Sequence, residues 1–351
     1  MDVYSRLLYI CNCLTSDCAW ENILFKDKAL IRDKCPRTVY NKWCLIAMGA
    51  ERKTIVDAGI GRTTGTFITD RPGLELVRSR IVDDIRTTVE DAGATGVVVA
   101  MSGGIDSTAT AELAVEALGS DRVLGLGLPC HKSERAGVSE ARTIAEGLGI
   151  EFREIQLRPV LEAFEEAAAI ELEPGDDASG DDARPDERTH ALGNVIARLR
   201  MCCAYYAANR QRRIVLGTAN RSELLLGYFT KYGDGAADAY PLGDLYKTEV
   251  RALAERIGVP RRIVSKEPSA GFWAGQTDAD ELGATYDVID PLLQRLVDED
   301  ESIENAAATL EIDRETARSL AWLYTETEHK RSLPPTPGIA DRGAEQSLPG
   351  Q

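Results

Sequence analysis

The spacing of apolar and polar residues becomes regular only near residue 74. The first regular stretch has apolar residues at helical spacing and ends at a glycine, Gly93; these apolar residues are Leu76, Ile81, Ile85 and Val89. Residues 1–70 show no sustained period. We therefore expect an irregular extension over 1–70, disordered or the product of a start site assigned too far upstream, and a folded domain over 71–337.

Beyond Gly93, short apolar runs alternate with helical patterns. The runs predict strands at Val97–Ala100, Val123–Leu128, Phe152–Leu157 and Ile214–Leu216. The helical patterns predict helices at Ile105–Leu118, Val138–Leu148, Asn194–Ala208, Glu249–Ile257 and 299–324. Strands that alternate with helices indicate an α/β fold, a doubly wound, Rossmann-like parallel sheet with helices on both faces.

Three other segments carry different signals. Residues 171–188 are acidic and rich in Pro and Gly, which predicts a mobile loop, and residues 338–351 are expected to be disordered. His329 and Lys330 precede Pro334 and Pro335, which predicts an extended tail lying over the surface.

Charge and lysine content divide the chain at about the same point. Residues 1–70 have 10 Lys+Arg against 8 Asp+Glu, whereas residues 71–351 have 31 against 49. The last 281 residues contain only five lysines. An acidic, lysine-poor domain suits concentrated salt, which screens repulsion between carboxylates, although a merely acidic protein would also fit. The same charge argues against a nucleic-acid partner.

The spacing of the cysteines and the length of the apolar runs argue against a zinc module and against a membrane protein. Cys11, Cys13 and Cys18 lack the paired CxxC spacing of a zinc module, and Cys202 and Cys203 are expected to be packing residues. His131 and His190 belong to no motif and are expected to be structural. No apolar run is long enough to span a bilayer and no signal peptide is evident, so we expect a soluble cytoplasmic protein with no membrane partner.

The candidate chemistry begins where the first strand ends, in the sequence "VVVAMSGGIDSTAT" at 97–110. Glycines at a strand-to-helix turn let backbone N–H groups approach a phosphate, and the helix N-terminus adds positive potential. The hydroxyls of Ser102 and Ser107 are further donors. Asp106 would repel a phosphate unless it held Mg²⁺, which prefers hard oxygen ligands. A glycine turn with a simple helix cap is the structural alternative.

The segment Ser102-Gly103-Gly104-Ile105-Asp106-Ser107 resembles the pyrophosphate loop of the ATP pyrophosphatase superfamily. Four further motifs follow in order and resemble the NAD⁺ synthetase family over about 74–337: "GNVIARLRM" (193–201), "GTANRSELLLGYFTKYGDGAADAYPLGDLYKTEV" (217–250), "KEPSAGFWAGQTDADELG" (266–283) and "HKRSLPP" (329–335). The resemblance implies the adenine nucleotide alpha-hydrolase-like form of the α/β fold, and a homodimer. Four of the five lysines beyond residue 70 lie inside these motifs.

The resemblance also implies site residues. Those for ATP are Ala100, Met101, Ser102, Gly103, Gly104, Ile105, Asp106, Ser107, Thr218, Lys247 and Ser269. Those for Mg²⁺ are Asp106 and Glu223. Those for deamido-NAD⁺ are Arg198, Lys231, Asp238, His329 and Lys330. The catalytic residues are expected to be Asp106, Lys247 and Ser269.

The implied reaction converts the nicotinate carboxylate of deamido-NAD⁺ into an amide. ATP activates the carboxylate as an acyl-adenylate, pyrophosphate leaves, and ammonia displaces AMP. Glutamine-dependent relatives carry an N-terminal amidase domain, which seventy irregular residues cannot form, so free ammonia is the expected donor. The glycines of "PSAGFW" suit a lid. Rival functions are another amidating or adenylating enzyme with this loop, similar to GMP synthetase, and a non-catalytic nucleotide-binding regulator.

Overall fold

The computed structural model describes residues 66–172, 185–268 and 277–335 of the 351-residue chain. The expected extension lies almost wholly outside these ranges, as do Ser269, the "GFW" part of the lid motif, most of the acidic loop and the 338–351 tail. Among the described residues, none of the helices has the length and apolar content needed to cross a membrane.

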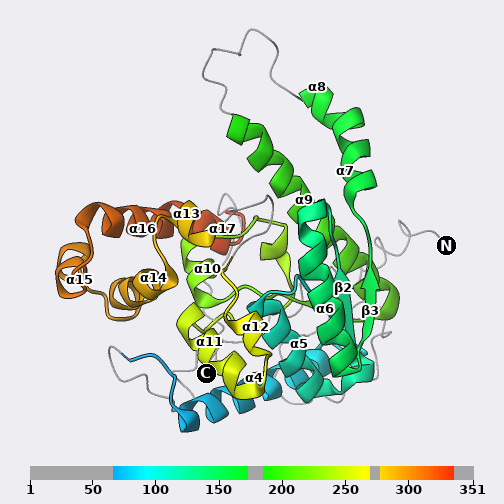
Figure 1. Cartoon of the computed structure of the whole chain (residues 1–351), viewed down its shortest axis with the longest axis horizontal. Coiled ribbons are helices and arrows are strands. Elements are labelled where there is room, and N and C mark those ends of the chain that lie inside the picture. Colours follow the sequence, from blue (N-terminus) through cyan, green and yellow to red (C-terminus); the bar gives the residue numbers. More distant parts are fainter. Residues whose placement is uncertain (1–65, 173–184, 269–276, 336–351) are drawn as a thin grey trace, which may run out of the picture. The chain divides into compact units, whose positions relative to one another are not determined.

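Figure 1 shows the elements in chain order. The strands are β1 (Val97–Ala100), β2 (Val123–Gly127), β3 (Glu151–Glu154) and β4 (Ile214–Leu216). The helices of the first half are α4 (Arg71–Asp91), α5 (Ile105–Leu118), α6 (Arg135–Leu148), α7 (Arg158–Phe164), α8 (Ile170–Leu172) and α9 (Pro185–Gln211). Those of the second half are α10 (Arg221–Leu226), α11 (Lys247–Ile257), α12 (Arg261–Val264), α13 (Asp278–Leu282), α14 (Tyr286–Leu293), α15 (Ile303–Thr309), α16 (Arg314–Glu326) and α17 (Glu328–Arg331).

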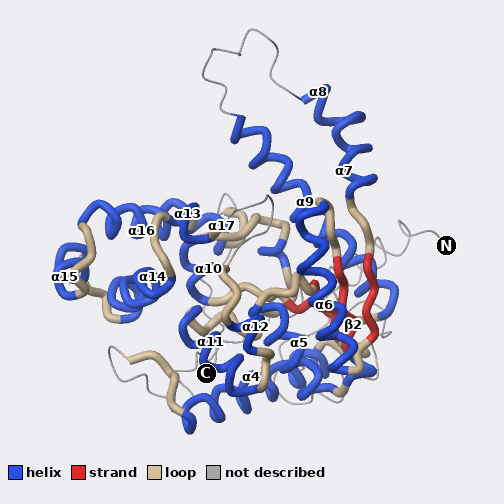
Figure 2. Tube along the Cα trace, in the orientation of Figure 1, coloured by secondary structure: helices blue, strands red, loops and turns tan. Residues whose placement is uncertain are grey.

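The four strands form one parallel sheet in the order β3-β2-β1-β4 (Figure 2). Val97 pairs with Val123 on one side and with Ile214 on the other, so β1 is central. The chain moves outward from β1 through β2 to β3 and then returns to the opposite side of β1 as β4. The loops that follow β1 and β4 therefore diverge and leave a crevice at their carboxyl ends, the usual ligand site of such sheets.

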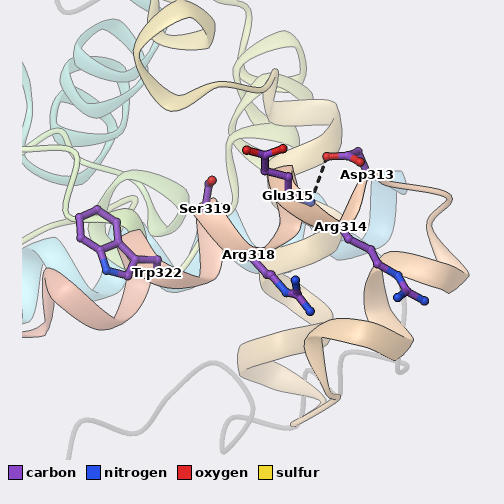
Figure 3. A pocket seen from close by; sticks show the side chains of 6 residues that line it. All are labelled: Asp313, Arg314, Glu315, Arg318, Ser319 and Trp322. Atoms are coloured by element: carbon purple, nitrogen blue, oxygen red, sulfur yellow. Dashed lines mark hydrogen bonds between the residues drawn. The ribbon is translucent and has the colours of Figure 1, made fainter.

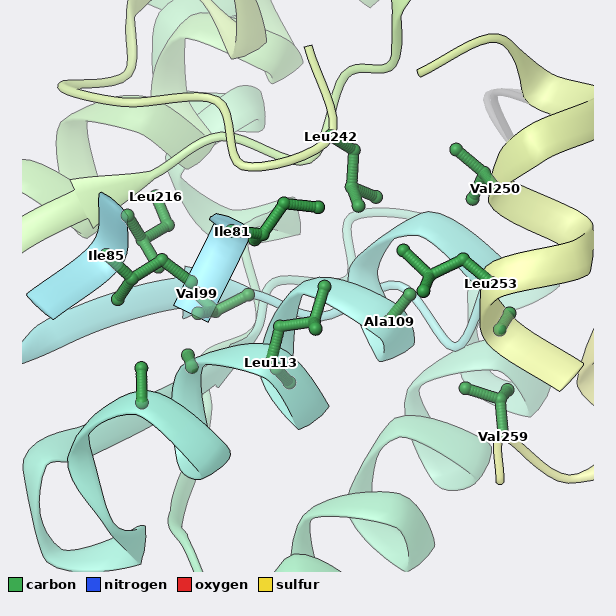
Figure 4. Packing of buried hydrophobic residues seen from close by; sticks show 14 of the residues in the cluster. Ile81, Ile85, Val99, Ala109, Leu113, Leu216, Leu242, Val250, Leu253 and Val259 are labelled. Atoms are coloured by element: carbon green, nitrogen blue, oxygen red, sulfur yellow. The ribbon is translucent and has the colours of Figure 1, made fainter. Parts of the chain in front are cut away.

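Helices cover both faces of the sheet, as the alternating pattern predicted. On one face α4, α5, α6 and α11 pack against Val97 and Val99 of β1. Figure 4 shows part of this core, in which side chains from four elements meet: Ile81, Ile85, Val99, Leu113, Val250 and Leu253. On the other face α7 and α9 pack against Val98, Leu124 and Val215. Burial on both faces explains why β1, β2 and β4 are continuous apolar runs, whereas the edge strand β3 is not.

A third cluster holds the C-terminal helices together. Leu226 of α10 and Tyr246 pack with buried residues of α13, α14, α15 and α16. Buried Asp290 fastens α14 to this group, because it accepts hydrogen bonds from the Ser222 hydroxyl (2.5 Å) and from the Thr248 hydroxyl (2.7 Å). The cluster therefore keeps α10 and the start of α11 in a fixed relation.

The expected boundary at residue 70 needs correction. Asp70 caps α4 through a bond from the Gly73 N–H, the N–H of buried Ile68 donates to Glu249 (2.9 Å), and the Phe67 ring meets Tyr246 edge-on. Residues 67–70 are thus part of the packed domain. The helical face predicted for α4 was wrong at Leu76, which is half-exposed, because 76 and 81 are about 140° apart on a helix.

Four further expectations differ from the structure. The third strand ends at Glu154, although the Leu157 N–H still donates to Pro129. The helix expected over 299–324 is two helices, α15 and α16, separated where Glu311 adopts a positive φ of 54°. Residues 328–331 form a helical turn and not an extended tail, because the prolines lie beyond its end. Cys202 is exposed on α9, whereas Cys203 packs as expected.

Candidate active site

The loop between β1 and α5 has the shape that its glycines allow. Gly103 has a φ of +77°, and a Cβ there would lie 2.2 Å from the carbonyl oxygen of Gly137 on α6. In return, a Cβ on Gly137 would lie 2.5 Å from the carbonyl oxygen of Ser102. Both positions therefore require glycine, and the loop lies directly on the first turn of α6.

Hydroxyl groups close the same loop. The Ser107 Oγ, which is buried, accepts from the Ser102 N–H and lies 3.3 Å from the Ser102 Oγ. Thr108 donates to the Gly104 carbonyl (2.8 Å). Gly104 is the N-cap of α5 and has no side chain to bond the first-turn N–H groups. The start of a fourteen-residue helix is thus left without a side-chain cap, an arrangement that favours an anion.

Asn220 joins this loop to the segment after β4. It caps α10 by accepting from the Glu223 N–H (3.1 Å), while the Glu223 carboxylate accepts from the Asn220 N–H (3.2 Å). The Asn220 amide also donates to Asp106 Oδ1 (3.0 Å). Asn220 is fully buried and therefore fixes the two carboxylates relative to each other.

Lys247, the first residue of α11, lies between those carboxylates. Its Nζ is 2.6 Å from Asp106 Oδ2 and 3.2 Å from Glu223 Oε1, and its side chain is 3% exposed. Burial alone lowers the pKa of Lys247, but the charges of Asp106 and Glu223 outweigh burial and raise it above its ordinary value. Burial raises the pKa of Glu223 to about 7, although Lys247 opposes the shift. The ammonium is therefore fully charged at neutral pH.

Tyr286 and the acidic residue Asp278 also lie near the Lys247 ammonium. The ammonium lies 5.2 Å from the centre of the Tyr286 ring. The Tyr286 hydroxyl donates to buried Asp278 (2.9 Å), which also accepts from Tyr228 (3.2 Å). Burial raises the pKa of Asp278, and Lys247 opposes that shift. Asp278 and Tyr286 also line a hollow of about 490 Å³ between α11, α12 and α14.

A second cluster gathers the residues expected for the dinucleotide. Arg198 of α9 donates to the Lys231 carbonyl (3.2 Å), and Lys231 Nζ donates to the His329 carbonyl (2.5 Å). Lys330 Nζ donates to the carbonyls of Gly227 (2.7 Å) and Phe229 (3.0 Å). Three segments distant in sequence therefore meet at the loop after α10.

Asp238, also expected at the dinucleotide, has protein partners on both carboxylate oxygens. Oδ1 accepts from the Tyr205 hydroxyl (2.9 Å) and Oδ2 from the Val215 N–H (2.9 Å). Asp238 thus fastens the 237–240 segment to the end of β4 and to α9. These contacts give Asp238 a structural role in holding this turn.

The carboxylates present fit a Mg²⁺ ion that is held partly by the protein and partly by the phosphates of a bound nucleotide. Asp106 and Glu223 supply hard carboxylate oxygens that both contact the Lys247 ammonium. Within the described ranges, no group of three or more His, Cys, Asp or Glu side chains is arranged to hold a metal ion alone. Mg²⁺ commonly takes one or two carboxylates and completes its shell with phosphate oxygens and water.

The structure thus brings together Asp106, Glu223 and Lys247, as expected, and it places half-buried Thr218 in the loop directly after β4. The sequence analysis missed Asn220, Tyr286 and Asp278. The Asn-x-x-Glu spacing of 220–223 is a capping-box signature that could have identified Asn220. Asp278 lies inside the quoted 266–283 motif, which is the signal that could have identified it. Tyr286 lies outside the motifs and reaches Lys247 only through tertiary packing.

Another hollow, of about 530 Å³, lies along α16 (Figure 3). It contains none of the expected site residues, and its lining is Asp313, Arg314, Glu315, Arg318, Ser319 and Trp322. The chemistry-bearing side chains therefore point to the crevice after β1 and β4 and not to this surface.

Comparison with known proteins shows the family of this chain. The family model described as NAD synthase matches residues 77–334. The NH₃-dependent NAD⁺ synthetase of Pyrococcus furiosus is 43% identical over 271 residues, which cover 77% of this chain and 97% of that protein. The NH₃-dependent NAD⁺ synthetase of Halobacterium salinarum is 42% identical over 260 residues, covering 74% of this chain and 92% of the relative.

Solved structures show the same fold. NMN synthetase from Francisella tularensis aligns with a TM-score of 0.64 and 33% identity, over 76% of this chain and 99% of that one. The NH₃-dependent NAD synthetase from Campylobacter jejuni, in complex with nitrate, aligns with a TM-score of 0.59 and 28% identity, over 75% and 98%. The aligned region contains both clusters described above.

Proposed function

Since this chain belongs to the NAD synthase family, we propose that it is a ligase that forms a C–N bond, converting deamido-NAD⁺ to NAD⁺ with ammonia and ATP. The nicotinate carboxylate attacks the α-phosphate of ATP, which gives an acyl-adenylate and pyrophosphate. Ammonia then displaces AMP and leaves the amide. A carboxylate is a poor electrophile, so the protein must align two anions and exclude water from the adenylate.

One observation carries this proposal: the carboxylates of Asp106 and Glu223 meet the Lys247 ammonium, each within hydrogen-bond distance, beyond the carboxyl ends of the neighbouring strands β1 and β4. The loop at 102–104 and the first turn of α5 bind the phosphates of ATP through backbone N–H groups. Lys247 Nζ, which retains its proton, stabilises negative charge that develops on the phosphates. Ser269 is proposed as a further contact to ATP.

Mg²⁺, when bound, neutralises charge on the departing pyrophosphate. Asp106 and Glu223 would hold it. The dinucleotide end of the site is formed by Arg198, Lys231, His329 and Lys330, of which the arginine and the two lysines supply positive charge for an anionic substrate. Asp238 is proposed as a further contact to the dinucleotide.

The test is direct synthesis. The purified chain, ATP, Mg²⁺, ammonium and deamido-NAD⁺ are expected to yield NAD⁺ and AMP in equal amounts, measured by chromatography. Glutamine alone is expected to give no NAD⁺. ATP binding without AMP formation would support a nucleotide-binding regulator instead, and AMP formation only with a different acceptor would support a related amidating enzyme.

A second candidate substrate comes from the likeness to NMN synthetase. That protein's name says that it makes NMN, the mononucleotide half of NAD⁺. The same assay with the deamidated mononucleotide tests this candidate. We expect the dinucleotide to give the higher kcat/KM, because the sequence relatives at 42–43% identity are NAD⁺ synthetases.

We also propose that the chain forms a homodimer. Five of the nine large exposed apolar side chains in the described part lie on the consecutive stretch from the end of β3 through α9: Ile155, Val160, Ile170, Leu172 and Tyr206. Exposed apolar side chains concentrated on one part of the chain favour burial against a second copy. Light scattering is expected to give twice the 38.3 kDa chain mass, and Val160→Asp to reduce it to one chain.

A further inference from the structure

Arg331 makes an unusual set of contacts for an arginine near the end of a domain. Its Nη1 donates to the Leu225 carbonyl (2.6 Å) and to the Thr327 hydroxyl (2.9 Å), and its Nη2 donates to the Tyr324 carbonyl (2.5 Å). The Leu224 carbonyl lies 3.4 Å from Nη1. The guanidinium also lies 4.8 Å from the centre of the Tyr324 ring. Arg331 thus joins the carbonyl ends of α10 and α16.

The neighbouring residues strengthen the same junction. Lys330 bonds the Gly227 carbonyl, the next one after α10. Gly227 itself has a φ of +63°, and a Cβ there would lie 2.3 Å from the Cβ of Thr327. The backbone of the α10 terminus is therefore in direct contact with the segment that carries Arg331. Cations at a helix carbonyl end satisfy open carbonyls and oppose the negative end of the dipole.

Helix α10 has only six residues, and a helix of that length is not stable alone. Its first turn carries Asn220 and Glu223, which contact Asp106 and Lys247. Its last turn leads to the loop with Lys231. A displacement of its carbonyl end would therefore move Glu223, which lies only two residues before Leu225, about 3 Å along the helix axis at 1.5 Å per residue.

We propose that Arg331 is a positioning residue for amidation, which caps the carbonyl end of α10 and so holds Glu223 beside Asp106 and Lys247. This inference rests on the proposed function for its kinetic consequences. Arg331 contacts the carbonyl ends of α10 and α16 and not the reacting atoms, so its effect is transmitted along α10. It belongs to the junction of α10 with α16 and not to the dinucleotide cluster of Arg198 and Lys231.

The experiment compares Arg331→Ala and Arg331→Lys with Arg318→Ala as a matched control. Arg318 is an exposed arginine on α16 paired only with Glu304 at 3.5 Å, so its loss removes the same charge without touching α10. Each variant is assayed at a temperature at which circular dichroism shows it fully folded. For Arg331→Ala, kcat is expected to fall about tenfold or more, because a shift near 1 Å at a reacting centre can cost two decades.

The two KM values distinguish this role from substrate binding. For Arg331→Ala the KM of deamido-NAD⁺ is expected to stay within about twofold, since Arg331 does not contact that substrate, whereas the KM of ATP is expected to rise, because Glu223 is displaced from the ATP end of the site. Arg331→Lys is expected to be intermediate, because lysine keeps the charge but lacks the planar fork. Added guanidinium ion is expected to restore part of kcat in Arg331→Ala and none in Arg318→Ala.

A second readout does not require turnover. Calorimetry with ATP and Mg²⁺, without the dinucleotide, is expected to show weaker binding in Arg331→Ala than in Arg318→Ala. A lower melting temperature with unchanged kcat and ATP binding would overturn the inference, as would a rise confined to the KM of deamido-NAD⁺. If Arg331→Ala does not fold, wild-type kcat in Arg331→Lys would overturn it. Absence of NAD⁺ synthesis by the wild type would instead reject the proposed function, and calorimetry would still decide the role of Arg331.

Discussion

At the scale of single residues, the ammonium of Lys247 holds the candidate site together. It is buried between two carboxylates and lies over an aromatic ring. The motif identified Lys247 from the sequence, but its burial could not be predicted. Lysine is rarely buried unless it is paired, and the two partners of Lys247 lie far from it in sequence: Asp106 is 141 positions away and Glu223 is 24 positions away.

Replacement of Lys247 by methionine is expected to lower the free energy of unfolding by about 3 kcal/mol at pH 7.5, since loss of one partner leaves buried charge uncompensated. The cost should be smaller at pH 5, where Glu223 takes up a proton and needs no cation. Urea unfolding at the two pH values measures both effects. Equal costs at both would mean that Lys247 does not interact with Glu223 in the way its geometry indicates.

Glu223 gives the site its own pH dependence. Because burial raises its pKa in the folded state to about 7, the folded protein holds this proton more tightly than the unfolded chain. The stabilisation from Glu223 is therefore complete below its unfolded pKa, near 4.5, and is lost as the pH rises through about 7.

The variant Glu223→Gln has no such proton to lose. Without Mg²⁺, the wild type should lose stability relative to Glu223→Gln between about pH 4.5 and 7, by an amount on the order of 1–3 kcal/mol. Unfolding curves at constant salt provide the difference. Parallel curves across this range would show that Glu223 titrates normally, and Glu281→Gln serves as a control carboxylate on α13.

At the scale of elements, the close contact between the loop after β1 and the first turn of α6 makes a sharp prediction. Gly103→Ala should lose about 1–3 kcal/mol, because its φ of +77° and the Gly137 carbonyl both oppose a Cβ. ATP binding should weaken as well. Gly147→Ala is the matched control: it lies in α6 with no atom within 4 Å of the added Cβ, and should gain about 0.5 kcal/mol. A normal ATP affinity in folded Gly103→Ala would mean that the loop does not bind the phosphates.

Most elements near the site could be predicted from the pattern, because apolar runs and helical repeats report burial directly. β1, α5 and β4 have the predicted bounds. β3 was overestimated because it is an edge strand with largely exposed side chains, so its alternation carries little information. The contacts of Arg331 and Tyr286 could not be predicted, since they depend on how the C-terminal helices pack.

At the scale of the whole molecule, charge is unevenly distributed along the chain. With 49 acidic and 31 basic residues after position 70, repulsion between carboxylates should weaken the folded state in dilute buffer. We therefore propose that the protein is adapted to concentrated salt. Its melting temperature should continue to rise up to molar KCl, beyond the concentration that screens ordinary surface pairs. A melting temperature that is constant from 0.1 M upward would contradict this proposal.

Truncation tests how far the independent domain extends. Removal of residues 1–65 is expected to leave NAD⁺ synthesis intact, as the separate composition of this segment suggests. Removal of 1–70 should lower the melting temperature, because it deletes the Ile68–Glu249 bond and the cap at Asp70. Thermal melts of the two truncated chains measure the difference, and equal melting temperatures would show that residues 66–70 add nothing.

The short length of α10 also determines how its backbone amides exchange with deuterium. Its first turn is held by Asn220, the residue just before the helix, and its last turn by Arg331, about a hundred residues further along the chain. A helix of six residues has no independent stability, so its amides should open and exchange as one unit when either attachment is released. A peptide that spans α10 would then show slower deuterium uptake when ATP binds at one end or the dinucleotide at the other, which makes it a single reporter for the occupancy of both ends.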